Sequence, residues 1–156
     1  MRIRIDSRPS FWVGDLKRYA DRIAKFHLNP MGVQCEFSDS GNKNHIVIML
    51  DEGKSANLNT RGVEILYNPK KPVNERLAKY LLDGICSSTR FMNRGIRAED
   101  IAWDVHVTCG YITNVSDRAF LKDEARKRGI VWGIMESLKE CLKREPHSKR
   151  QNFIPA

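Results

Sequence analysis

The stretch HVTCGYITNVSDRAFL, residues 106–121, contains the end of a strand, a glycine turn and the start of a helix. Apolar residues alternate with polar ones up to Cys109, as in a strand, and Gly110 breaks the pattern. Ser116 and Asp117 are placed to cap the helix that follows. In α/β proteins the sheet edge where such a strand ends is the usual place for a functional site.

Strand and helix patterns alternate along the rest of the chain. The run HIVIML, residues 45–50, is apolar without a break, which is typical of a central strand buried on both faces. The other predicted strands are 2–6, 32–38, 62–67 and 101–112, the predicted helices are 13–27, 73–85 and 116–142, and the predicted long loops are 51–61 and 88–100.

This alternation predicts a three-layer α/β/α sandwich around a mainly parallel, twisted sheet. The length of 156 residues fits one domain with one core. We expect that domain to span residues 1–145, with a flexible basic tail over residues 146–156.

The composition favours an anionic partner. Lysine and arginine number 27 against 19 acidic residues, so the net charge is +8 and the isoelectric point about 9.5. Such a balance suits nucleic acid, an acidic lipid surface, an acidic wall polymer or an acidic protein. The basic run ARKRG, residues 125–129, is a candidate phosphate contact, although a solvated helix face is the commoner explanation. Aromatic residues make up 8% and do not interleave with this run, so nucleic-acid binding rests on charge alone.

The N-terminal sequence and the spacing of the cysteines indicate the cellular compartment of the protein. No apolar run reaches the length needed to span a bilayer, and the N-terminal residues lack the apolar segment of a secretory signal. The cysteines are widely spaced, with no CxxC pair, which favours reduced thiols over a zinc module. We therefore expect a cytoplasmic protein, and export by another route, such as a phage holin, stays open.

Five short blocks follow one another in the second half of the chain, over about residues 61–142: RGVEILYNP, NERLAKYLLDGI, NRGI, the strand end TCGY and the turn at Asn114. In their order and spacing, these blocks resemble the zinc-dependent N-acetylmuramoyl-L-alanine amidases of bacterial cell walls. The resemblance implies an amidase fold, peptidoglycan as the substrate class, a zinc cofactor and a bacterial or bacteriophage origin.

The residues that this family uses for catalysis are absent from the matching positions. The family has a zinc-binding His after the first strand, a Glu before the first helix, a second His after the next buried strand, and a catalytic Glu in a Glu-x-Gly-Phe strand end. Those positions here hold Arg8 or Pro9, Asp15 nearby, Leu50 or Asp51, and Thr108.

This loss matters because catalytic zinc needs about three protein ligands and an open position for water. A carboxylate then carries the proton from that water to the leaving amine. The resemblance therefore implies a pseudoenzyme without zinc that acts as a binding or assembly module, with peptidoglycan fragments or a partner protein as its ligand. The alternatives are an active amidase with an altered metal site and a basic nucleic-acid-binding protein.

Several polar residues are candidates for ligand binding at the strand ends. Arg94 and Glu64 match family positions, and Arg94 is equally explained by a surface ion pair. Asn114 is better explained as a turn residue, and Glu64 stays open. The expected groove also includes Thr108 and the loop that begins with Asp51 and Glu52.

His45 and His106 are the weak candidates for a substitute metal site, together with nearby acids and Cys109. No metal-binding spacing such as HExxH supports them, so we expect no metal. Cys109 with a histidine base would make a nucleophile. However, His106 is three residues away on the same strand and faces the opposite side of the sheet, which favours a core thiol.

Overall fold

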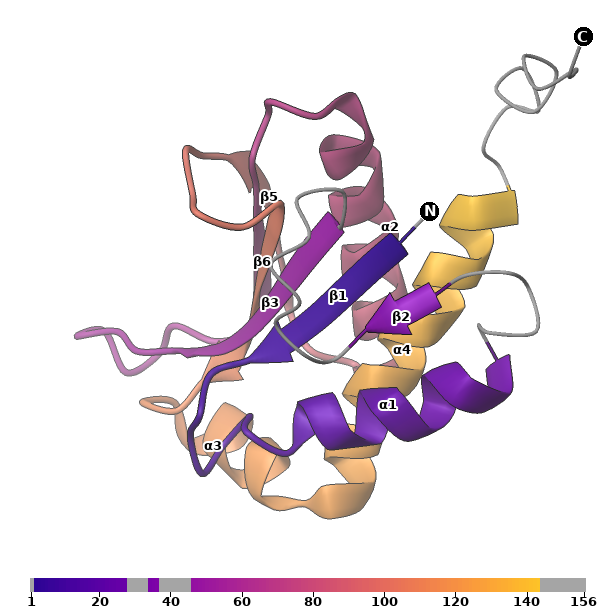
Figure 1. The fold of residues 1–156 in the computed structure, drawn as a ribbon. Coiled ribbons are helices and arrows are strands. Elements are labelled where there is room, and N and C mark those ends of the chain that lie inside the picture. Colours follow the sequence, from indigo (N-terminus) through magenta and orange to yellow (C-terminus); the bar gives the residue numbers. More distant parts are fainter. Residues whose placement is uncertain (1, 28–33, 37–45, 144–156) are drawn as a thin grey trace, which may run out of the picture.

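A mixed sheet forms the centre of the computed structural model, which describes residues 2–27, 34–36 and 46–143 (Figure 1). In the described residues its strands are β1 (Arg2–Ser7), β2 (Gln34–Glu36), β3 (Ile46–Gly53), β4 (Val63–Tyr67), β5 (Asn93–Ala98) and β6 (Val105–Tyr111), in the order β2-β1-β3-β6-β4-β5. Each neighbouring pair is parallel except β4 with β6. The predicted α/β class with a mainly parallel sheet is confirmed.

Residues 46–50 of the run HIVIML form most of β3, which pairs with β1 on one side and β6 on the other. Ile48 and Leu50 are fully buried, so the prediction of a central strand is confirmed. The strand continues to Gly53, three residues further than its apolar run, because the ladder with β6 extends past Asp51. Asp51 and Glu52 therefore belong to a strand end and not to the loop that the sequence predicted.

The helices are α1 (Leu16–His27), α2 (Pro72–Thr89), α3 (Val115–Lys122) and α4 (Glu124–Lys143). One hydrophobic core joins residues of all four to a single face of the sheet. Of the predicted three layers, the described residues supply the sheet and one helical layer. The other sheet face carries half-buried polar side chains, including Arg4, Asp6 and His106.

The packing of α2 on α4 depends on two glycines. A Cβ on Gly133 would lie 2.6 Å from the carbonyl oxygen of Gly84, closer than atoms can approach. The backbones of the two helices therefore touch at this point, and no larger residue fits on either side. This contact brings the C-terminal end of α2 beside the first half of α4 (Figure 1).

Three local predictions are wrong. Residues 93–98, predicted within a loop, form the edge strand β5, whose mostly exposed side chains leave no apolar alternation to detect. The predicted single C-terminal helix is two helices, because Asp123 is extended (φ −88°, ψ 117°) and accepts a hydrogen bond from the Arg126 N–H at 3.0 Å. The helix cap is Asn114 and not Ser116–Asp117.

None of the helices in the described ranges combines the length and the apolarity needed to cross a membrane. The predicted basic tail, residues 146–156, and His45 lie outside the described residues. The domain boundary at residue 145 stays a prediction.

Candidate functional site

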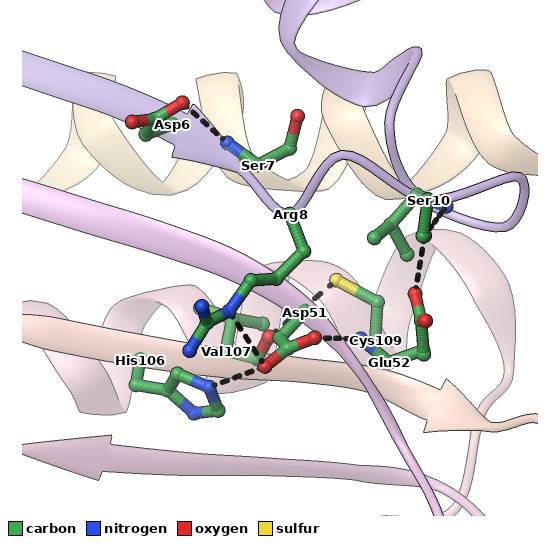
Figure 2. A network of polar contacts seen from close by, with 10 residues as sticks. Asp6, Ser7, Arg8, Ser10, Asp51, Glu52, His106, Val107 and Cys109 are labelled. Carbon is green, nitrogen blue, oxygen red and sulfur yellow. Dashed lines mark hydrogen bonds and ion pairs between the residues drawn. The ribbon is translucent and has the colours of Figure 1, made fainter.

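Four side chains lie together where β1 and β3 end, beside the start of β6. We call them the Arg8 cluster: Arg8, Asp51, Trp103 and His106. Asp51 Oδ2 lies 3.1 Å from His106 Nε2 and 3.4 Å from Arg8 Nε (Figure 2). The Trp103 ring stacks on the His106 ring at 5.4 Å between centroids, and the Arg8 guanidinium lies 5.0 Å from the Trp103 ring. One carboxylate thus holds a guanidinium and an imidazole together.

The strand register explains this convergence. Met49 and Asp51 of β3 pair with His106 and Thr108 of β6, so these side chains share the sheet face away from the core. The chain extends β1 by one further hydrogen bond, from the Arg8 N–H to the Leu50 carbonyl at 2.9 Å, which delivers Arg8 to the same edge.

Thr108 stands between two acids. It pairs with Asp51 of β3 on one side and with Glu64 of β4 on the other. Glu64 is in turn held by two arginines of β5, with Arg94 Nε at 3.7 Å and Arg97 Nη2 at 3.6 Å. Thr108, which the sequence resemblance assigns to the family's catalytic Glu position, is therefore flanked by two carboxylates, each already paired with a cation.

The structure places the remaining ligand-binding candidates differently. Asn114 caps α3, accepting from the Ser116 and Asp117 N–H groups at 3.0 and 3.1 Å, and its Nδ2 donates to the Leu58 carbonyl. Glu52 accepts a hydrogen bond from Ser10 Oγ at 2.6 Å (Figure 2). Neither residue joins the Arg8 cluster, whereas Asp51, Thr108, Glu64 and Arg94 do lie on one face. A ligand-binding role for these residues stays a prediction.

Cys109 is a core residue. It is fully buried on the opposite sheet face from His106, and burial raises the pKa of its thiol to about 12. A thiol in that state carries almost no thiolate at neutral pH, so it does not provide a nucleophile.

Asp15, the acid nearest to the family's Glu ligand, points to a different partner. Its two carboxylate oxygens lie 3.0 and 2.8 Å from Nζ of Lys127, whose side chain is only 7% exposed. This ion pair ties the start of α1 to α4 and removes Asp15 from the strand ends.

Trp103 and Arg97 were missed by sequence reasoning. The predicted strand 101–112 would place Trp103 and His106 on opposite faces, but residues 102–104 form a bend that returns Trp103 over the histidine ring. Arg97 lay in the predicted loop. Periodicity carried no signal for either contact.

The donor set does not fit the zinc that the family implies. Within residues 2–27, 34–36 and 46–143, no three His, Cys, Asp or Glu side chains converge as a metal site requires. Asp51 and His106 supply two donor groups, but they bond to each other, and the second ring nitrogen of His106 is buried without a hydrogen-bond partner.

Comparison with known proteins agrees with this fold. Residues 30–140 match the family model for N-acetylmuramoyl-L-alanine amidase. The structure is similar to the N-acetylmuramoyl-L-alanine amidase AmiC2 of Nostoc punctiforme, with a TM-score of 0.76 at 16% identity over 92% of this chain and 98% of that one. It is also similar to the catalytic domain of CwlV from Bacillus (Paenibacillus) polymyxa var. colistinus, with a TM-score of 0.73 at 15% identity over 93% and 100%.

A third similar structure is the CwlD amidase of Clostridioides difficile in complex with the GerS lipoprotein, with a TM-score of 0.72 at 13% identity over 92% of this chain and 99% of that one. No curated protein sequence gave a match. Identities this low establish the fold alone, and the family model, which covers more than half of the chain, establishes membership. The chain belongs to the N-acetylmuramoyl-L-alanine amidase family.

Proposed function

We propose that this chain is a catalytically inactive amidase-like domain that acts as a binding or assembly module. The observation that carries the proposal is the Arg8 cluster. At the ends of β1 and β3, where the family has its zinc-binding histidines, a guanidinium lies against a carboxylate, with Arg8 Nε 3.4 Å from Asp51 Oδ2. Arg8 is a permanent cation that cannot bind a metal ion. It neutralises Asp51 without any zinc.

Thr108 supports the same conclusion. The family's reaction needs a carboxylate to take a proton from water and pass it to the leaving amine. A threonine hydroxyl is too weak a base to accept a proton from water at neutral pH. The two flanking acids do not replace it, because Asp51 is engaged by Arg8 and His106, and Glu64 by Arg94 and Arg97.

The alternative is an active amidase with an altered metal site. It would have to recruit His106, whose Nε2 bonds to Asp51 and whose Nδ1 is buried. Its other candidate, His45, lies outside the described residues. The inactive domain is therefore the function that the described geometry supports best.

The ligand belongs to this proposal as well. Family membership supports peptidoglycan fragments as one class, and the complex of the CwlD amidase with a lipoprotein supports a partner protein as the other. A cytoplasmic location and a bacterial or bacteriophage source are part of the same proposal. The comparisons give no support to the nucleic-acid alternative, which rests on the net charge of +8 alone.

Elemental analysis of protein purified without added metal tests the missing zinc site. We expect zinc far below one equivalent, because no set of three free donors is present in the described residues. Near-stoichiometric zinc that is lost in an Asp51→Ala or His106→Ala variant would support the altered metal site instead.

Co-sedimentation with purified insoluble peptidoglycan tests the ligand class. We expect the wild-type chain to be retained without releasing peptide, and an Arg94→Glu variant to be retained less. Lys79→Glu, an equal charge change on the exposed side of α2, is the matched control. Absence of retention would exclude wall fragments as the ligand.

A further inference from the structure

Three neighbouring hollows on the helical side of the molecule share lining residues. The first, of about 450 Å³, shares Thr89, Arg90, Phe120 and Arg126 with the second, of about 520 Å³. The second shares Ser88 and Gly129 with the third, of about 510 Å³. We call this feature the arginine groove. It runs past the C-terminal end of α2 and the first half of α4.

Five arginines line the arginine groove, and their charge is largely uncompensated. They are Arg22, Arg61, Arg90, Arg126 and Arg128. Among the described residues, Arg128 is the one of the five with an ion pair, to Glu124 at 4.0 Å. The acid in the lining, Asp117, already accepts hydrogen bonds from the Gly62 and Tyr111 N–H groups at 2.7 and 2.9 Å. Among the described lining residues, an anionic ligand would therefore meet five arginines against one buried acid, Asp117.

The basic run at residues 125–129 explains part of this arrangement. The helix separates its three cations: Arg126 lines the first two hollows, Arg128 lines the third, and Lys127 is buried against Asp15. Two of the three charges that looked like a solvated helix face thus line one groove.

The two ends of the arginine groove differ in chemistry. The third hollow is lined by Trp132, which is 44% exposed, and by Tyr19, which is 6% exposed and has the Arg128 guanidinium 5.4 Å from its ring. The rings at the other end, Phe91 and Phe120, pack against each other at 4.2 Å between centroids and against the core. They are not free to stack on the bases of a nucleic-acid strand, which needs open aromatic faces along its path.

We propose that the arginine groove binds an acidic peptide segment of a partner protein. Its carboxylates would lie on Arg61, Arg90 and Arg126, and a large apolar side chain would enter the third hollow beside the exposed Trp132. Hollows of this size suit groups of that kind. The groove borders the helical core, whereas the Arg8 cluster lies on the opposite sheet face, so this binding does not depend on the loss of catalysis.

Gly129 offers a way to close the groove without disturbing the fold. It lines the second and third hollows, and a Cβ there would meet the Ser88 carbonyl oxygen at 3.5 Å and Thr89 Cγ2 at 3.9 Å, which are ordinary contacts. Gly129→Glu places a carboxylate inside the groove. Gly129→Ala, which keeps the groove open, is the matched control.

The test uses the full chain and fluorescence anisotropy with three labelled probes: a decapeptide of eight Glu and two Phe, the same peptide with Gln for Glu, and a ten-nucleotide oligothymidylate. We expect the Glu–Phe peptide to bind the wild-type chain and the Gly129→Ala variant alike. The Gln–Phe peptide, and the Gly129→Glu variant with the acidic probe, should both bind at least about tenfold more weakly.

A second pair of variants guards against a folding defect. Arg61→Glu with Arg126→Glu should weaken the acidic peptide by at least about tenfold, whereas Lys70→Glu with Lys79→Glu, an equal charge change on exposed lysines elsewhere, should not. Three results would overturn the proposal: no binding of the acidic peptide at about 1 mM, equal binding by both Gly129 variants, or oligothymidylate binding as tightly as the peptide.

Discussion

Replacing Thr108 with Glu restores the one side chain that the family needs for proton transfer, and the structure predicts that the fold resists it. Thr108 pairs in register with Asp51 on β3 and with Glu64 on β4. A carboxylate at this position would be the third on three adjacent strands. Thr108→Gln has nearly the same size without the charge, so the difference between the two variants isolates the electrostatic effect.

The size of the effect follows from the sheet geometry. Adjacent strands are about 4.8 Å apart, so the new carboxylate would lie roughly 5 Å from each neighbour. Two like charges at about 5 Å repel by about 0.8 kcal/mol in water and about 3 kcal/mol in a partly buried site. Arg8, Arg94 and Arg97 offset part of this repulsion. We expect the free energy of unfolding of Thr108→Glu to be about 1–3 kcal/mol below that of Thr108→Gln.

Urea denaturation of both variants at pH 7 measures this difference. It should shrink below about pH 4, where carboxyl groups take up protons. The Thr108→Glu variant should also show no amidase activity, since the carboxylate and the zinc-bound water act as a unit. A Thr108→Glu variant as stable as Thr108→Gln would show that the three carboxylates do not repel one another, and one that zinc stabilises would show that a metal site is present.

Three further predictions concern the core. Gly133→Ala should lower the free energy of unfolding, measured by urea denaturation, by about 2 kcal/mol or more, because the new Cβ meets the backbone of α2. Gly129→Ala on the same helix should raise it by up to about 1 kcal/mol. Equal stabilities of the two variants would contradict this packing. Lys127→Met should lower the free energy of unfolding by about 1–3 kcal/mol, because it leaves the Asp15 carboxylate, which is one quarter exposed, without its partner. Adding Asp15→Asn to the same chain should recover part of that loss. Burial raises the pKa of the Cys109 thiol to about 12, whereas in urea the pKa returns to its usual range near 9. At pH 8, Cys109 should therefore react with iodoacetamide roughly a thousandfold more slowly in the folded chain than in urea. Equal rates by mass spectrometry would place this thiol at the surface.

Much of the fold could be predicted from the sequence because the core follows simple patterns. The unbroken apolar run of β3 marked the centre of the sheet, and the alternation before Gly110 marked β6 beside it. The apolar periodicity does not reveal a strand whose side chains are exposed, as in β5. It also does not reveal a helix end that a single residue determines. Asp123 ends a helix within a segment whose apolar spacing continues, and no periodicity reports such a break.

The candidate site was partly accessible to the same reasoning. Strand ends in a parallel sheet meet at one edge, which is enough to bring Asp51 and Thr108 together. The residues that contact Asp51 and His106 come from segments outside the strands. The spacing of apolar residues along the sequence does not predict such contacts. Arg8 follows β1 and reaches Asp51 across the sheet, and Trp103 reaches His106 through a bend.

We propose that this chain, a member of the amidase family, has kept the fold and lost the reaction. The most direct test incubates the purified wild-type chain with soluble muropeptides, with and without added zinc, and measures released peptide by liquid chromatography and mass spectrometry. We predict no release above the buffer control in either condition, because the proposed function assigns Arg8 and Thr108 to the positions where the reaction needs a zinc ligand and a carboxylate. Peptide release that zinc increases and a chelator abolishes would contradict the account.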